Sequence, residues 1–96
     1  MRLRDRLPEL RDEIRRVAAE SGARDVRVFG SVARGEERDG SDVDFLVAVD
    51  PGRSLLDLAR LELRLEQLLG RPVDVVTEAG LRDSIRATAL REAIRV

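Results

Sequence analysis

Two aspartates one residue apart, Asp42 and Asp44, stand at the start of an apolar run that extends to residue 49. Because side chains alternate along a β-strand, both carboxylates are expected on the same face. Neighbouring carboxylates repel each other and raise each other's pKa unless a cation lies between them. Two divalent ions about 3.5–4 Å apart can clamp the attacking and leaving oxygens of a phosphoryl displacement. The pair therefore indicates metal-dependent transfer at a phosphate group.

A third carboxylate, Asp74, lies in the run 73–77, Val-Asp-Val-Val-Thr, which alternates in the manner of a strand. Alternation places the valines at 73 and 75 on one face and Asp74 on the other. On a strand beside the first, this parity would let Asp74 join Asp42 and Asp44. It could then ligate one metal ion and accept a proton from an attacking hydroxyl.

A phosphate-binding turn is predicted ahead of the carboxylates, at Gly30 and Ser31. Gly30 lets a ligand approach the backbone, and a helix beginning at Ser31 would direct free N–H groups and a positive dipole end toward it. The Ser31 hydroxyl adds a donor, and Arg34 adds a full positive charge. A Gly-Ser pair alone is a weak signal, because many strand-to-helix turns contain one.

Each of these residues also has a purely structural interpretation. Asp42 could be a turn residue, Asp44 an edge-strand charge that discourages aggregation, and Asp74 a solvent-facing residue of an alternating strand. Taken singly, each aspartate is better explained in this way. Taken together, behind a Gly-Ser turn, they favour a catalytic site.

Two flanking residues are more ambiguous. Arg34 could contact phosphate, or it could pair with Glu36 or Glu37. Ser41 suits the ordering of the loop better than contact with a substrate, although its place beside Asp42 keeps it among the candidate nucleotide-binding residues.

Composition narrows the chemistry further. The chain has no Cys and no His, and all 18 of its basic residues are Arg, so thiolate, imidazole and lysine chemistry are excluded. Carboxylates, hydroxyls, arginines and hard metal ions such as Mg²⁺ or Mn²⁺ remain. A net charge of -1 and few aromatic residues argue against direct nucleic-acid binding. With no apolar span and no signal-peptide pattern, we expect one cytoplasmic domain over residues 1–96.

The elements that would position the site alternate between helices and strands along the chain. The strand 43–49 would place Val43, Phe45 and Val47 against helices, and the aspartates on the opposite face. Asp39-Gly40 and Pro51-Gly52 are turn signals. Four helices are expected: 5–21, a short one at 31–34, one of about four turns that begins at a Ser54–Asp57 capping box, and one at about 81–94. The expected strands are 25–29, 43–49 and 73–77.

Two leucines fall outside the predicted core stripe of the helix after Ser54. Leu56 and Leu63 are seven residues apart and lie almost opposite that stripe. They are either ordinary exposed leucines or part of a partner surface. The last helix also has an apolar face too wide for one contact, so we expect it to meet something besides the domain.

The motifs resemble those of a known superfamily, the polymerase β-like nucleotidyltransferases, and most closely its minimal nucleotidyltransferase branch. The resemblance covers nearly the whole chain. It rests on Gly30-Ser31, Gly35, Ser41-Asp42-Val43-Asp44, Val73-Asp74-Val75-Val76 and the tail 85–94. It implies an α+β fold in which helices flank a small mixed sheet. It also implies a nucleoside triphosphate and Mg²⁺, with two ions expected and Mn²⁺ as an alternative.

The resemblance also implies a reaction, in which an acceptor hydroxyl attacks the α-phosphate and pyrophosphate leaves. Gly30 and Ser31 would hold the triphosphate, Asp42 and Asp44 would ligate metal, and Asp74 would be the third ligand and the base. Minimal members are similar to antitoxins that use ATP to adenylylate a tyrosine of a HEPN-domain toxin ribonuclease. A hetero-oligomer with such a toxin is therefore a possible assembly.

Three functions compete at this point. The first is adenylyl transfer to a partner protein, since 96 residues leave no room for a domain that holds an acceptor. The second is an antitoxin that neutralises its toxin by binding alone, although occlusion requires no metal ligands. The third is transfer to a small molecule, for which nothing in the chain resembles a pocket.

Overall fold

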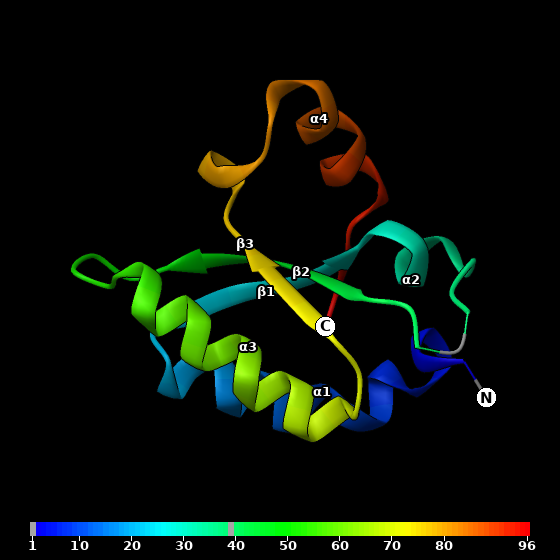
Figure 1. Ribbon diagram of the computed structural model, residues 1–96, viewed down its shortest axis with the longest axis horizontal. Helices are drawn as coiled ribbons and strands as arrows, with labels where there is room; N and C mark the ends of the chain where they lie inside the picture. The colour runs from blue at the N-terminus through cyan, green and yellow to red at the C-terminus, as the bar shows by residue number, and fades with distance from the viewer. Residues whose placement is uncertain (1, 39) are drawn as a thin grey trace.

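The computed structural model describes residues 2–38 and 40–96, and within them four strands form one mixed sheet in the order β3-β2-β1-β4 (Figure 1). The central strand β1 is antiparallel to both β2 and β4, whereas β2 and β3 are parallel. The strands are β1 (Ala23–Phe29), β2 (Val43–Val49), β3 (Val73–Val76) and β4 (Ile94–Arg95). This is the predicted α+β fold with a small mixed sheet.

The helices divide between the two faces of the sheet (Figure 1). The long helices α1 and α3 cover one face, and α4 stands over the other. The short α2 follows β1 directly, as predicted. The helices are α1 (Leu3–Glu20), α2 (Gly30–Arg34), α3 (Leu55–Leu69), the 3₁₀ turn η1 (Glu78–Gly80) and α4 (Asp83–Glu92).

The alternation of β2 divides the core in the predicted way. Val43, Phe45 and Val47 are buried in the main cluster against α1 and α3. Leu46 faces the other way and forms a smaller cluster with Leu81 and Ala89 beneath α4. The face that carries Asp44 is therefore apolar in its middle and polar toward the start of β2.

The capping box of α3 is confirmed. Asp57 accepts a hydrogen bond from the Ser54 N–H at 2.9 Å, and Ser54 accepts from the first turn. Leu61 and Leu65 are fully buried, whereas Leu56 and Leu63 are each 60% exposed. The leucine stripe therefore packs on the sheet, and the second pair lies on the solvent side of the described structure.

The C-terminal part of the chain differs from the prediction. The last helix ends at Glu92 instead of 94, and Ile94 pairs with Val28 in the unpredicted strand β4. The backbone turns extended at Ala93, and the Val96 N–H donates to the Val26 carbonyl at 3.0 Å. Burial of Val96 in the main cluster stabilises this strand instead of a further helical turn.

Other differences are small. β1 begins two residues earlier than predicted and contains an irregularity between Arg24 and Arg27, and β3 ends at Val76. The turn predicted at Asp39-Gly40 includes Asp39, which lies outside the described residues. Among the helices that the structure does describe, none is both long and apolar enough to cross a membrane.

Candidate active site

Asp44 and Asp74 are brought together by the pairing of β2 with β3. The two residues are direct partners in the parallel register, between the pairs Val43–Val73 and Phe45–Val75. Partnered residues point to the same side of a sheet, so both carboxylates project from the face opposite α1 and α3. Asp42 lies just before β2 and is exposed.

The predicted phosphate turn lies against this pair. Phe29, the last residue of β1, is the antiparallel partner of Asp44, and Gly30 follows with φ of +74°. A Cβ at Gly30 would lie 2.3 Å from Oδ2 of Asp44. Only glycine leaves room for that carboxylate at this backbone conformation, so Gly30 and Asp44 belong to one site.

The electrostatics of Asp44 reflect its neighbours. Burial raises the pKa of Asp44, and the negative charges of Asp74 and then Asp42 raise it further, while Arg34 acts in the opposite direction. The carboxylate is half-buried and carries no hydrogen bond to another side chain in the described residues. Such a group gains most from a cation placed among its neighbours.

Arg34 forms ion pairs in the structure, which was one of its two interpretations from the sequence. Its guanidinium contacts Glu92 of α4 at 2.9 Å and Glu36 at 3.3 Å. The hydrogen bond that Arg34 donates to Glu92 is the main reason that the pKa of Arg34 is raised. The pairing with Glu36 was among the predicted alternatives, whereas Glu37 pairs elsewhere. Arg34 remains close enough to lower the pKa of Asp44.

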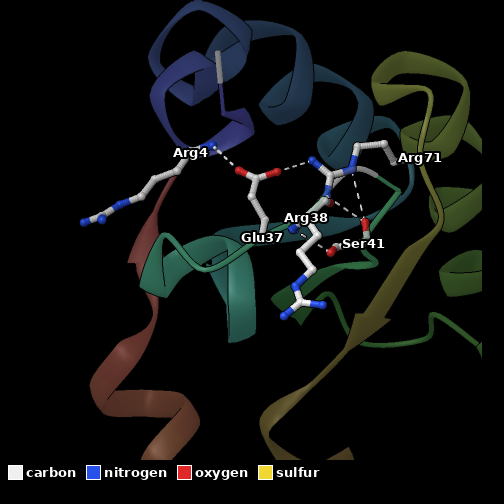
Figure 2. A network of polar contacts seen from close by, with 5 residues as sticks. All are labelled: Arg4, Glu37, Arg38, Ser41 and Arg71. Carbon is white, nitrogen blue, oxygen red and sulfur yellow. Dashed lines mark hydrogen bonds and ion pairs between the residues drawn. The ribbon is translucent and has the colours of Figure 1, made fainter.

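Ser41 orders its loop. Its hydroxyl accepts a hydrogen bond from the Arg38 N–H at 2.8 Å, and its carbonyl accepts from the guanidinium of Arg71 (Figure 2). The side chain is therefore engaged within the loop. Its neighbour Asp42 depends on this loop for its position at the start of β2.

A cavity of about 440 Å³ opens above the carboxylate pair. Such a volume is in the range of small-molecule sites. Asp44 and Asp74 form part of its wall, and the segment before and into α4 forms the opposite side. Its lining residues are Phe29, Asp44, Asp74, Val76, Gly80, Leu81, Arg82, Ser84 and Ile85.

Residues 7–96 match the family described as "Nucleotidyltransferase domain". The chain belongs to this family. Its resemblance to a minimal nucleotidyltransferase is confirmed, and the protein is an enzyme of the nucleotidyltransferase class.

Two relatives of this nucleotidyltransferase have names of the same enzyme class. A candidate protein adenylyltransferase of Methanocaldococcus jannaschii is 39% identical over 88 residues, covering 92% of this chain and 95% of its own. Protein adenylyltransferase MntA of Thermococcus cleftensis is 47% identical over 75 residues, covering 78% and 76% of the two chains.

Solved structures share the fold of this nucleotidyltransferase. A structure described as a candidate minimal nucleotidyltransferase superposes with a TM-score of 0.85 at 52% identity, covering 100% of this chain and 97% of that one. A toxin–antitoxin crystal structure with AMP-PNP gives a TM-score of 0.74 at 17% identity, covering 88% of this chain and 69% of that one. The latter likeness is evidence of the fold alone.

The donor chemistry of the nucleotidyltransferase site fits a hard divalent ion, since its candidate ligands are carboxylate oxygens and the chain has no Cys or His to compete. The half-buried Asp44 beside two like charges fits such an ion as well. Over residues 2–38 and 40–96, however, no three acidic side chains lie close enough together to hold a metal ion. Asp44 and Asp74 are strand partners, and Asp42 lies two residues before Asp44, just ahead of β2.

Sequence reasoning missed two parts of the site. Glu92 belongs to α4 and meets Arg34 across 58 residues of chain, a pairing that no local pattern indicates. Arg82 and Ser84 line the cavity from the segment that leads into α4. The only advance signal was the unusually wide apolar face of the last helix, which predicted contacts with more than one surface.

Proposed function

We propose that this nucleotidyltransferase transfers AMP from ATP to a hydroxyl group of a partner protein, in the presence of Mg²⁺. We further propose that the hydroxyl belongs to a tyrosine of a HEPN-domain toxin and that the chain acts as its antitoxin. The single observation that carries the catalytic part is the register that sets Asp44 beside Asp74, with the Gly30 turn against Asp44.

The residues would divide the work as follows. Gly30 and Ser31 hold the triphosphate through backbone N–H groups and the Ser31 hydroxyl. Asp42, Asp44 and Asp74 hold two Mg²⁺ ions, which when bound stabilise the charge that develops on the phosphate oxygens.

The remaining roles concern protons and charge. Asp74 is more exposed than its strand partner Asp44, and it accepts the proton of the acceptor hydroxyl. Arg34, the last residue of α2, contributes positive charge toward the triphosphate when it releases Glu92. Ser41 supports the loop that carries Asp42.

The choice of acceptor is supported by the relatives and by the shape of the site. Two relatives have names that assign protein adenylylation, and one structure of the same fold is a toxin–antitoxin complex with an ATP analogue. The cavity above Asp74 is bordered by Ile85, which is 46% exposed. A tyrosine on another protein could reach the carboxylates from this open side.

The test uses the purified chain, a purified HEPN-domain toxin, Mg²⁺ and ATP labelled at the α-phosphate. Transfer of label to the toxin is expected, and the double substitution Asp42→Asn/Asp44→Asn is expected to abolish it. Normal labelling by the double variant would overturn the proposed chemistry. Protection of cells by an inactive double variant would instead show that binding alone neutralises the toxin.

A further inference from the structure

A buried ion pair lies between α1 and the loop that leads into β2 (Figure 2). Arg71, in the turn between α3 and β3, contacts the carboxylate of Glu37, and their side chains are only 16% and 5% exposed. The other ion pairs of the described residues have at least one partner that is more than a third exposed. This pair is therefore set apart by its burial.

Arg71 also binds the backbone of the loop. Its Nε and Nη2 donate to the carbonyl oxygen of Ser41 at 3.1 and 2.8 Å, and Nη2 reaches the Arg38 carbonyl at 3.4 Å. The planar guanidinium thus uses its donors on three acceptors of one loop, a geometry that lysine cannot reproduce. Figure 2 shows the guanidinium between Glu37 and the Ser41 carbonyl.

Glu37 anchors the same loop to α1. Its carboxylate accepts from the Arg4 N–H at 3.1 Å as well as from Arg71. Burial alone would raise the pKa of Glu37, but the hydrogen bonds from Arg71 and the Arg4 N–H outweigh burial and lower it. The carboxylate is therefore charged at neutral pH and fixed on two sides.

The position of this cluster along the chain relates it to the site. Arg71 is three residues before Asp74, and the carbonyl that it holds belongs to Ser41, one residue before Asp42. The Val43 N–H donates to the Pro72 carbonyl at 2.9 Å in the same region. Arg71 therefore joins the starts of the two strands that carry the acidic residues.

We propose that Arg71 and Glu37 are positioning residues, which hold the segment of Asp42 and Asp44 at a fixed separation from Asp74. This inference rests on the proposed function, because it assumes that these carboxylates bind the metal ions of the reaction. Neither Arg71 nor Glu37 touches the nucleotide or the metal. Groups that support metal ligands commonly change metal affinity or activity by about 10–100-fold when they are removed.

The experiment titrates the full chain with Mn²⁺ in the absence of nucleotide and measures free Mn²⁺ by electron paramagnetic resonance. Arg71→Gln is expected to raise the Mn²⁺ dissociation constant about 10–100-fold. Arg71→Lys is expected to recover only part of this loss, because its single ammonium cannot satisfy Glu37 and the Ser41 carbonyl together. Each variant is measured well below its own unfolding temperature.

A second variant separates positioning from folding. Arg71→Met/Glu37→Met removes both charges, so that neither is left buried and unpaired, and such replacements often preserve stability. It is expected to fold and still to bind Mn²⁺ about 10-fold or more weakly. Wild-type Mn²⁺ affinity in this folded double variant, or in folded Arg71→Gln, would overturn the inference. Failure of the double variant to fold would also overturn it, since stability alone would then explain both effects.

Two controls make the outcomes distinct. Arg64→Gln removes a different Arg–Glu pair, between α3 and Glu20 of α1, and is expected to leave Mn²⁺ affinity unchanged. Asp44→Asn is expected to abolish Mn²⁺ binding. Wild-type binding by Asp44→Asn would overturn the proposed function itself and this inference with it. Loss of binding in Asp44→Asn together with normal binding in Arg71→Gln would overturn the positioning role alone.

Discussion

Asp44 and Asp74 are direct partners in the parallel pairing of β2 with β3, with their carboxylates on the same face of the sheet. This register places the exposed carboxylate of Asp74 beside the half-buried carboxylate of Asp44. Two carboxylates in this arrangement destabilise the folded chain when both are ionised. The repulsion between the two carboxylates lowers the stability of the folded chain, and a cation bound between them would remove that repulsion.

The first prediction concerns the stability effect of this arrangement. The folded-state pKa of Asp44 is raised, so the ionised form is disfavoured by folding. Stability from this group is fully present below the ordinary aspartate value of about 3.9 and is lost as pH rises through the raised pKa. At pH 7 without divalent ions, Asp44→Asn is therefore expected to raise Tm.

Thermal unfolding at pH 7 and pH 3 measures this difference. The gain from Asp44→Asn is expected to vanish at pH 3, where the wild-type carboxyl is also neutral. Addition of Mg²⁺ with ATP is expected to stabilise the wild type and not the variant, because only a ligand that binds the folded state raises its stability. A variant less stable than wild type at pH 7 would contradict the assigned cause of the pKa shift.

The second prediction concerns the close approach of Gly30 to Asp44. Gly30→Ala places a Cβ 2.3 Å from Oδ2 at a φ of +74°, so the Asp44 carboxylate must move away. Displacement of a reacting group by about 1 Å can cost 100-fold in rate. We therefore expect AMP transfer to fall about 100-fold or more, as measured with labelled ATP.

Gly52→Ala is the matched control for this substitution. Gly52 has a φ of +86°, and a Cβ there would meet no atom within 4 Å. Both variants carry the same backbone cost of about 1–2 kcal/mol, but only Gly30→Ala also displaces a carboxylate. Equal losses of transfer in the two variants would show that backbone strain, and not Asp44, is responsible.

Much of the site was predictable because strand alternation is a local rule. The run 43–49 indicates by itself which residues pack on helices and which face the site, and Asp74 follows the same rule in its own strand. The structure adds the register of these strands, which depends on their pairing. No local pattern determines that Asp44 lies opposite Asp74 and not one position further along.

The long-range features were not predictable from the sequence. Glu37 and Arg71 are 34 residues apart, and the chain offers 18 arginines and 19 acidic residues among which pairs could form. The strand β4 was missed because its two residues are too few to show alternation, while Leu90 and Ile94 are spaced like neighbours on a helix. The contacts of Ile94 and Val96 with β1 form the strand instead.

The third prediction concerns Arg34, which pairs with Glu92 and Glu36. If it turns to the triphosphate, Arg34→Gln removes one charge-assisted hydrogen bond and raises KM for ATP about 10-fold. The stability change is expected to be small, because Arg34 is exposed and water screens its ion pairs. Glu92→Gln is the control and should leave KM for ATP unchanged or lower. An unchanged KM for ATP in Arg34→Gln would show that Arg34 forms its ion pairs and does not contact the triphosphate.

The fourth prediction tests whether β4 contributes to the stability of the fold. Val96 is 3% exposed and packs in the main cluster, so Val96→Ala is expected to cost about 1–3 kcal/mol and to lower Tm accordingly. Leu56→Ala, at a leucine that is 60% exposed, is expected to change stability by less than about 0.5 kcal/mol. Chemical denaturation of both variants measures the contrast. Equal stability of the two would mean that the residues after α4 do not pack on β1 in solution, and that the sheet ends at β1.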